Sequence, residues 1–315
     1  MIFEIKILGT GSATPAHRRH PSAQVVNYNE QLYLLDCGEG TQIQFLKYHV
    51  KASRVNNIFI SHLHGDHFFG IMGFLNSLNL NGRTETVNLY APFPLSDFLT
   101  HMLSISNSRF QFHLNFIPTN PTKHYVLFEN ELFQIETIPL KHNIECCGFL
   151  FREKPRKRKI DTTKIDLSKI PFPDIKNLKN GLDIAVENGK IIFNKEVTLD
   201  PPLPRSYAYC TDTMYSEDII PLIKGVDLLY HEATFLNDML ERAVETCHST
   251  SSQAGQIAKK SGCEKLIIGH FSSRYKDIEP FLEETKIEFP NTFLAKEGDL
   301  ITLPEKVSQS VYEQP

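Results

Sequence analysis

Short apolar runs bounded by turn residues dominate the first half of the chain. Each run is flanked by Gly, Asn or Pro, a pattern typical of strands in a largely buried sheet. Four such strands are expected, in IFEIKILG from Ile2, QVVNY from Gln24, QLYLLDCG from Gln31 and NNIFISH from Asn56. The first half therefore predicts a sheet-based α/β core.

Strand-like and helix-like runs alternate in the second half. SYAYCTD, VDLLYHEAT and EKLIIGH are expected strands, and SEDIIPLIKG, between the first two, has helical spacing. Such βα units collect functional side chains at the carboxyl ends of their strands. Asp212, His231 and His270 hold these positions and are the first candidates for a site.

Residues 151–205 differ in character from both halves. They begin near REKPRKRK, in which six of eight residues are basic, and continue through KIPFPDIKNLKNG to DPPLPR. Prolines, charges and few long apolar runs indicate an excursion that adds little to the core. We therefore expect a flexible arm inserted between a first half at 1–150 and a second half at 206–315. Its basic run is either a solvated loop or a grip on phosphates.

Composition narrows the class of protein. The 315 residues are 41% hydrophobic and 22% charged, and the formal net charge of −4 gives no general attraction to nucleic acid. Any polyanionic partner would need a local basic patch. Six cysteines without a CxxC pair indicate free thiols. With no membrane-spanning run and no signal-peptide pattern, we expect a cytoplasmic protein.

The stretch SHLHGDH at residues 61–67 is the strongest chemical signal in the chain. A strand ending at Ile60 would present His62 and His64 on the same side. Gly65 would permit a tight turn that brings Asp66 and His67 in front of a helix-like FFGIMGFL. Imidazole and carboxylate ligands favour zinc, although imidazole also suits iron or nickel. A polar loop with chance histidines is the weaker interpretation.

This stretch resembles the signature of the metallo-β-lactamase superfamily, and other motifs narrow the resemblance to the ribonuclease Z family of tRNA 3′-end endonucleases. The matching motifs are LGTGSATP, LLDCGEGTQIQ, SHLHGDHFFG, HEATF, HSTSSQAG and HFSSRY, spread over nearly the whole chain. The resemblance implies an α/β fold, an αββα sandwich, with a two-zinc site at one edge.

The same resemblance implies a ligand set. One Zn²⁺ would be held by His62, His64 and His142, the other by Asp66, His67 and His270, and Asp212 would bridge the two. Two zinc ions about 3.5–4 Å apart can activate a water molecule and clamp the charge that grows on a phosphodiester. Taken singly, several of these residues also fit structural roles such as turn or strand-end positions.

The resemblance also suggests catalytic partners for the metal ligands. Asp66 would accept the proton of the attacking water, and His248 would protonate the departing ribose oxygen. His248 precedes Thr250 and Gln253, whose spacing predicts a capping box at a helix start. His231 and Glu232 either orient His248 or support its loop.

Several further residues are expected to contact the substrate. Ser272, Ser273 and Arg274 follow the ligand His270 closely enough to reach a phosphate, and the fork of an arginine suits that group. In the loop Pro15–His20, Arg19 is retained from the Pro-x-Lys-x-Arg-Asn pattern of the family, but His17 and His20 replace the lysine and the asparagine. The arm has Pro171–Asp174 where the family has a glycine-proline element.

The basic run of the arm would hold the tRNA by phosphate contacts. Its candidate residues are Arg156, Lys157, Arg158 and Lys159. An arm far from the catalytic edge also suits a homodimer, in which one subunit presents substrate to the other. The expected activity is hydrolysis of precursor tRNA that leaves a 3′-hydroxyl on the tRNA and a 5′-phosphate on the trailer. The alternatives are a hydrolase of a small phosphodiester, thioester or lactam, and a non-catalytic RNA-binding protein.

Overall fold

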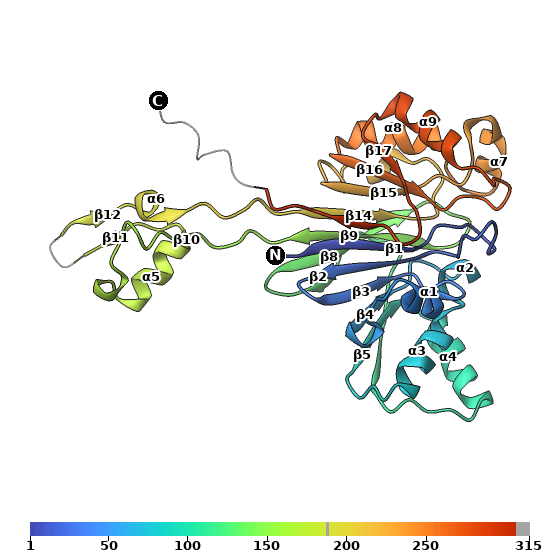
Figure 1. Cartoon of the computed structure of the whole chain (residues 1–315), viewed down its shortest axis with the longest axis horizontal. Coiled ribbons are helices and arrows are strands. Elements are labelled where there is room, and N and C mark those ends of the chain that lie inside the picture. Colours follow the sequence, from blue (N-terminus) through green and yellow to red (C-terminus); the bar gives the residue numbers. More distant parts are fainter. Residues whose placement is uncertain (187–188, 307–315) are drawn as a thin grey trace. The chain divides into compact units, whose positions relative to one another are not determined.

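Two seven-stranded sheets are the largest in the residues that this computed structural model describes, 1–186 and 189–306 (Figure 1). The first sheet has the order β18-β1-β2-β3-β4-β5-β6 and contains Phe3–Gly9 (β1), Ala23–Tyr28 (β2), Gln31–Leu35 (β3), Val55–Phe59 (β4), Val87–Ala91 (β5), Leu114–Pro118 (β6) and Leu300–Thr302 (β18). The second has the order β17-β16-β15-β14-β9-β8-β7 and contains Val126–Glu129 (β7), Phe133–Leu140 (β8), Cys146–Glu153 (β9), Ser206–Cys210 (β14), Leu228–Glu232 (β15), Lys265–Gly269 (β16) and Thr292–Leu294 (β17).

Helices cover the outer face of each sheet (Figure 1). Those on the first sheet are Thr41–Lys47 (α1), Gly65–Phe68 (α2), Ile71–Leu80 (α3) and Pro94–Ile105 (α4), and those on the second are Leu240–Glu245 (α7), Ser251–Ser261 (α8) and Glu279–Glu288 (α9). Short 3-10 helices span Ala52–Arg54, Leu167–Lys169, Glu217–Ile219 and Asn237–Met239. One hydrophobic cluster lies under each helical layer.

Aromatic side chains fill the space between the sheets. Phe59 of β4 packs edge-on against Phe149 of β9, with ring centroids 5.5 Å apart, and Tyr33 of β3 meets Phe151 in the same way. Large buried rings supply most of the apolar area in such a layer, because each buries roughly 150–250 Å². The layers therefore follow the order helix, sheet, sheet, helix, and the expected αββα sandwich is confirmed.

Parallel strands align the chain segments that carry the candidate site. β14, β15 and β16 are parallel neighbours, with Cys210 opposite His231 and Glu232 opposite Gly269. Because their carboxyl ends meet at one edge, the loops that follow them converge there. β4 likewise lies parallel to β3 and β5 in the other sheet. The predicted strands in both halves are confirmed, with small changes at their ends.

Two local predictions were wrong. Residues 216–225 do not form a helix but only the 3-10 turn Glu217–Ile219, because Pro221 has no N–H to continue a helical ladder. Gly65 does not form a tight turn: it begins α2. It is glycine for a different reason, since a Cβ there would lie 2.2 Å from a ring carbon of Phe69.

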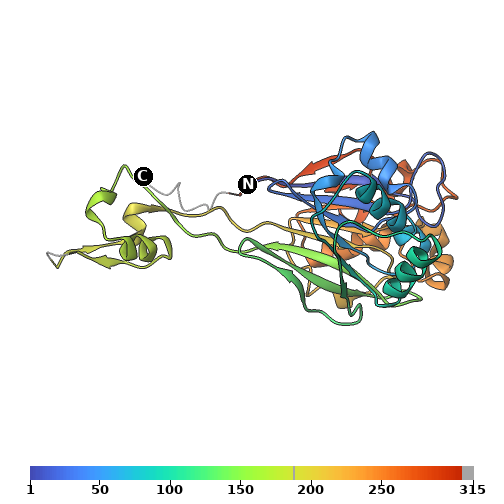
Figure 2. The ribbon, with the colours of Figure 1, turned by 90° about the horizontal axis from the view of Figure 1, so that it is seen from below.

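The chain divides into two compact units. The sandwich unit comprises Met1–Glu129, Ile135–Phe151 and Ser206–Leu303, and the inserted unit comprises Asn130–Gln134, Arg152–Arg205 and the described residues 304–306. The inserted unit contains Phe172–Lys179 (α5), Asn194–Val197 (α6) and the short strands Lys159–Ile160 (β10), Ile184–Ala185 (β11), Ile191–Ile192 (β12) and Thr198–Leu199 (β13) (Figures 1 and 2).

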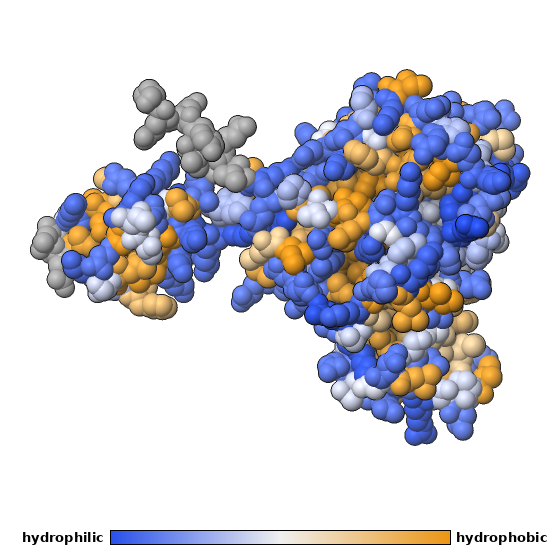
Figure 3. Space-filling view, in the orientation of Figure 1, coloured by the Kyte–Doolittle hydropathy of each residue, from blue (hydrophilic) through white to orange (hydrophobic). Residues whose placement is uncertain are grey.

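The inserted unit has a small apolar core of its own, which the sequence did not lead us to expect. Its buried members are Ile160, Ile170, Leu178, Ile184 and Val197. Hydrophilic side chains cover much of the face of this unit drawn in Figure 3, with hydrophobic ones between them.

A buried ion pair lies where the two chain segments of the inserted unit run side by side. The guanidinium of Arg205 donates to both oxygens of the Glu153 carboxylate, at 2.7 and 3.0 Å, and both side chains are 1% exposed. The backbone N–H of Glu153 also donates to the carbonyl of Arg205 at 2.9 Å. The ion pair therefore compensates the two buried charges, and the backbone hydrogen bond holds the two segments together.

Two further expectations concern thiols and membranes. All six cysteines lie in the described residues and are free thiols, as predicted. In the described part of the chain, the helices are too short or too polar to cross a bilayer.

Candidate active site

Seven residues from four segments of the chain converge at one edge of the sandwich unit. His62 and His64 follow β4, Asp66 and His67 lie in α2, His142 follows β8, Asp212 follows β14 and His270 follows β16. His270 has a φ of 63°, a left-handed conformation that is unusual for a histidine and marks a constrained position. The structure thus brings together every residue that the sequence proposed as a metal ligand.

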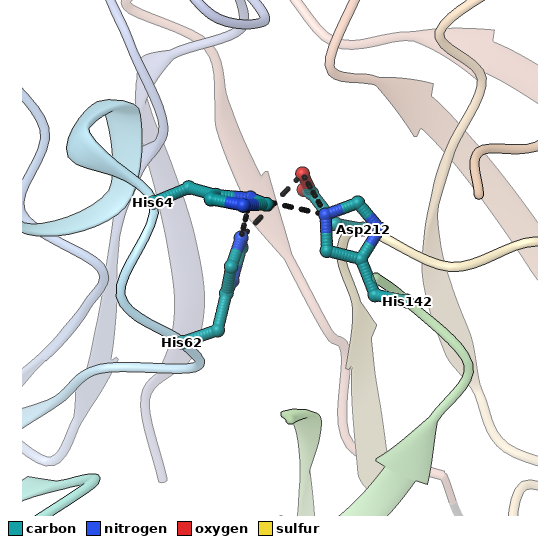
Figure 4. Close-up of side chains that lie close together, drawn as sticks. All are labelled: His62, His64, His142 and Asp212. Atoms are coloured by element: carbon teal, nitrogen blue, oxygen red, sulfur yellow. Dashed lines mark hydrogen bonds and ion pairs between the residues drawn. The ribbon is translucent and has the colours of Figure 1, made fainter. Parts of the chain in front are cut away.

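The first group contains His62, His64, His142 and Asp212 (Figure 4). Nδ1 of His64 lies 3.1 Å from Nε2 of His62 and 3.0 Å from Nε2 of His142. The Oδ2 atom of Asp212 lies 3.6 Å from Nε2 of His62 and 3.7 Å from Nε2 of His142. Three nitrogens and one oxygen therefore face a common point.

The second group contains Asp66, His67 and His270. The Nε2 atoms of the two histidines are 3.3 Å apart, and Oδ2 of Asp66 lies 3.5 Å from His67 and 3.4 Å from His270. Oδ1 of Asp212 lies 3.1 Å from Nε2 of His67 and 3.2 Å from Nε2 of His270. Asp212 therefore directs one oxygen to each group.

Oxygen partners hold four of these histidines in orientation. In each, Nδ1 faces away from the group and lies close to an oxygen, while Nε2 faces inward. The contacts join His62 to Oγ of Ser61 at 2.9 Å, His67 to Asp36 at 2.8 Å, His142 to the carbonyl of Cys247 at 2.9 Å and His270 to Oγ1 of Thr234 at 3.0 Å. Such contacts fix the tautomer and the ring direction that a metal ligand needs.

Asp36 is a functional residue to which sequence reasoning assigned no role. Its buried carboxylate contacts Nδ1 of His67 and accepts hydrogen bonds from the N–H and the hydroxyl of Ser61 and from the hydroxyl of Tyr209. Its φ of 54° is left-handed. The only available signal was its place in LLDCGEGTQIQ, directly after a predicted strand.

The donor set fits a pair of bound divalent cations. The inward nitrogens and oxygens lie 3.0–3.7 Å apart, where their lone pairs would repel one another unless a cation lay between them. Burial opposes a charge on His67, yet Asp212, Asp66 and Asp36 raise its pKa well above the ordinary value. The carboxylates around His67 therefore favour positive charge in the second group, whereas burial lowers the pKa values of His62, His64 and His142 in the first. Imidazole and carboxylate donors of this kind suit zinc.

His248 lies beside the two groups and is paired with Glu232. Its Nδ1 is 2.7 Å from Oε1 of Glu232, whose side chain is fully buried. Oε1 also accepts from the N–H of Thr213, and Oε2 accepts from the N–H and hydroxyl of Thr234. Burial disfavours the charged imidazole, but the Glu232 carboxylate outweighs it and raises the pKa of His248 to about 9.

The loop of His248 is fixed by the helix that follows it. Thr250 caps α8, its hydroxyl accepts from the N–H of Gln253, and the Gln253 side chain returns a contact to the N–H of Thr250. The predicted capping box is confirmed.

His231 makes no hydrogen bond to His248 in the described part of the chain. Its Nδ1 contacts the carbonyl of Glu232 at 2.7 Å, and its Nε2 has no hydrogen-bond partner among the described residues. Side chains alternate along a strand, so His231 points to the opposite face of β15 from Glu232. Of the two candidates from HEAT, Glu232 alone reaches His248, and Thr234 of the same motif, which the sequence did not single out, contacts both His248 and His270.

A cleft of about 370 Å³ opens at the two groups. Its lining includes His64, Asp66, Asp212 and His248, together with Ser12, Ala13, Pro21, Glu39, Gly65 and Phe69. The N–H of Ala13 donates to Oδ2 of Asp66 at 2.7 Å. His67 opposes the effect of burial and lowers the pKa of Asp66, so this side chain is ionised.

The four residues near the site that were expected to contact a phosphate differ in exposure and in hydrogen bonding. Arg19 donates to the carbonyls of Ser272 and Tyr275, so it ties down the loop after His270. Ser272 is 8% exposed, and its hydroxyl accepts from the N–H of Arg274. Ser273 is half-buried, and Arg274 is exposed. Arg19 was predicted to bind substrate, but its guanidinium is engaged with this loop.

The four basic residues of the inserted unit divide into two kinds. Arg156 contacts Glu153 and Glu305, and Arg158 contacts Asp200 and Thr198, so both guanidinium groups are paired. Lys157 and Lys159 are exposed. Of these four residues, only the two lysines are presented to solvent without a carboxylate partner in the part of the chain that the structure describes.

Comparisons with known proteins give the site a context. Residues 3–166 match the family model described as "Anti-Pycsar protein Apyc1". Over 301 residues the chain is 44% identical to a protein named Ribonuclease Z from Bacteroides fragilis, a match that covers 96% of this chain and 99% of the relative. The solved structure of human tRNase Z, short form, has 27% identity and a TM-score of 0.69, covering 96% of this chain and 99% of that one. The metallo-beta-lactamase fold protein YhfI from Bacillus subtilis, at 19% identity and a TM-score of 0.68, covers 96% and 100% and is alike in fold alone.

Proposed function

Because this chain belongs to the ribonuclease Z family over nearly its whole length, and to the family described as Anti-Pycsar protein Apyc1 over residues 3–166, we propose that it removes the 3′ trailer of precursor tRNA with two Zn²⁺ ions. It is a metal-dependent endoribonuclease of tRNA 3′ processing. The proposed products are a 3′-hydroxyl on the tRNA and a 5′-phosphate on the trailer. The observation that carries the proposal is Asp212, whose two oxygens each face a different group of ligands.

The proposed ligands follow from these groups. His62, His64 and His142 would hold one Zn²⁺, and Asp66, His67 and His270 would hold the other, with Asp212 shared. Bound zinc would activate water and stabilise charge on the phosphate. The chain itself supplies the orientation, because Asp36, Ser61, Thr234 and the carbonyl of Cys247 fix the histidine rings.

Proton transfer is assigned to Asp66 and His248. Asp66 is ionised and lines the cleft, so it can accept the proton that the attacking water loses. His248 lines the same cleft, and its raised pKa keeps the imidazole protonated at neutral pH. The nitrogen that does not face Glu232 can therefore donate a proton to the 3′ oxygen as it leaves. Glu232 then acts as a positioning residue that stabilises the charged ring.

RNA binding is assigned mainly to the inserted unit. Residues 152–205 contain 13 Lys and Arg against 8 Asp and Glu, a formal net charge of +5, whereas the rest of the chain has −9. A polyanion is attracted to such a segment through its phosphates. Lys157 and Lys159 are the proposed contacts of the basic run, and Ser273 and Arg274 are proposed contacts near the site. We also propose a homodimer, by family resemblance, and a cytoplasmic location, because six free thiols fit a reducing compartment.

The direct test is cleavage of a 3′-extended precursor tRNA by zinc-loaded protein, beside His248→Ala and with bis-p-nitrophenyl phosphate as a small diester. A single cut near the tRNA 3′ end, with the products identified by their end groups, supports the proposal. Hydrolysis of the small diester alone would support the proposed metal site but contradict precursor tRNA as the substrate. This is the outcome expected for a small-phosphodiester or thioester hydrolase.

The role of the inserted unit is tested by RNA affinity at several salt concentrations. Lys157→Ala combined with Lys159→Ala should weaken binding and reduce the salt slope by roughly two phosphate contacts. The matched control is Lys51→Ala with Lys224→Ala, two exposed lysines of the sandwich unit, which should bind as the unaltered chain does. An equal loss of RNA affinity in both pairs of variants would mean that Lys157 and Lys159 are not specific contacts for the RNA.

A further inference from the structure

Phe69 is an exposed aromatic side chain inside the cleft that holds the ligand groups. Its side chain is 62% exposed, whereas the neighbouring Phe68 is 8% exposed and belongs to the hydrophobic core. Among the described residues that line the cleft, Phe69 is the one large apolar side chain, and Asp66, Asp212 and His248 lie in the same lining. The apolar face of this ring is therefore open at the place where the phosphodiester must enter.

The ring of Phe69 is held in position by contacts with the backbone of Gly65 and with Phe68. A Cβ on residue 65 would lie 2.2 Å from Cε2 and 2.5 Å from Cδ2 of Phe69, so the ring packs directly on the backbone of Gly65. Its other support is Phe68, whose ring centroid is 4.8 Å away at an interplanar angle of 61°. Phe68 packs in turn against Phe98. The aromatic surface is thus preorganised, and glycine at position 65 is what permits it.

We propose that Phe69 is a stacking platform for one of the two nucleobases that flank the cleaved phosphodiester. This inference rests on the proposed function, because it takes RNA as the substrate. Proteins recognise unpaired RNA by stacking splayed bases on aromatic rings, and every base offers a face for such a contact. Phe69 lines the cleft together with Gly65 and Asp66, which directly precede it in the lining. A base stacked on this ring would therefore place its phosphate next to the proposed metal ligands. Phe69 would thereby be a positioning residue for the cut.

The test combines Phe69 variants with altered substrates. Single-turnover cleavage is measured on a precursor tRNA and on two versions that carry an abasic nucleotide, one directly 5′ and one directly 3′ of the cleavage site. Phe69→Ala should lower kcat/KM on the unmodified precursor by about 5-fold to 150-fold, the range expected for one base stack. On one of the two abasic substrates this loss should vanish, because the partner of the ring is already missing. Phe69→Trp should retain activity.

Phe93→Ala is the matched control, since Phe93 is 61% exposed and lies outside the cleft lining. It should cleave the precursor as the unaltered chain does, and zinc content per chain and oligomeric state should be the same in all variants. If the unaltered chain does not cut the precursor, the proposed function fails. If it cuts, and Phe69→Ala is either as active or equally impaired on all three substrates, the stacking role fails. Impairment that follows a loss of zinc or a change in oligomeric state would likewise overturn it.

Discussion

Replacement of Glu232 by glutamine separates the role of its charge from the role of its shape. The carboxylate is fully buried, lies 2.7 Å from Nδ1 of His248, and accepts three further hydrogen bonds from Thr213 and Thr234. Glutamine keeps the size of the side chain and one acceptor oxygen but removes the negative charge. His248 then keeps its burial, which disfavours the imidazolium, and loses the neighbour that compensates for it.

The expected magnitude follows from the pKa of His248. Burial lowers this pKa, but Glu232 above all, together with Asp212 and Asp66, raises it from the ordinary 6.5 to about 9, a net difference equivalent to about 3 kcal/mol in favour of the charged ring. Without the Glu232 carboxylate the pKa should fall towards the ordinary 6.5, at which about 3% of the rings would be protonated at pH 8. Cleavage at pH 8 should therefore fall by about 30-fold from the protonation state alone.

The sign of the effect is visible in a pH profile of kcat. A general acid works while it is protonated, so activity should decline as the pH rises through about 9 in the unaltered chain and at a pH lower by more than two in Glu232→Gln. The stabilisation that the pair gives to the fold is complete below pH 6.5 and is lost as the pH rises through about 9. Glu232→Asp, which keeps the charge, should restore much of the alkaline activity. An alkaline limb that stays in place in Glu232→Gln, with equal loss at every pH, would refute the acid role of His248 or its control by Glu232.

Three further changes test the ligand groups and the inserted unit. Asp212→Ala should lower the zinc content below two ions per chain and abolish cleavage, which metal analysis and the tRNA assay would detect; full zinc content would contradict the bridging role. Asp36→Asn removes the charge that faces Nδ1 of His67 and should weaken zinc affinity by about 10-fold to 100-fold in a chelator titration, and unchanged affinity would show that Asp36 does not support the ligand. Glu153→Ala removes the carboxylate to which the buried guanidinium of Arg205 donates through two nitrogens, and should destabilise the fold by about 3–5 kcal/mol in denaturant unfolding, whereas a loss below about 1 kcal/mol would mean that the pair is not fully desolvated.

Much of the site could be predicted because its residues follow buried strands in short motifs. His62 and His64 are two positions apart after β4, and Asp212 and His270 follow two parallel strands of one sheet. Strand ends in parallel sheets meet at one edge, so local patterns were sufficient to place these side chains together. His142 was different: it comes from a looser motif, and only the family resemblance connected it with the others.

The residues that escaped prediction depend on contacts between distant segments. Asp36 reaches His67 across 31 positions, and Arg19 reaches the loop after His270 across more than 250. No local pattern distinguishes a carboxylate that supports a histidine from one in a turn, and no pattern shows whether an arginine meets a phosphate or a backbone carbonyl. Of the two roles considered for His231, the period-two alternation of strands makes the orientation of His248 the weaker one, because it directs His231 to the face of β15 opposite Glu232.

In the basic run at residues 156–159, the alternation of side-chain direction separates paired side chains from exposed ones. Arg156 and Arg158 have side chains that are 19% and 20% exposed and are paired with carboxylates, while Lys157 and Lys159 between and beyond them are exposed. An extended segment directs successive side chains to opposite sides, so a run of four cations offers only half of them to one surface. Arginine suits the paired positions because its planar fork meets two acceptors at once, and lysine suits the open ones as a mobile point charge. The proposed RNA binding by the inserted unit should therefore depend on the two lysines, and the stability of the unit on the two arginines, a division that the alternation of Arg and Lys in RKRK already indicates.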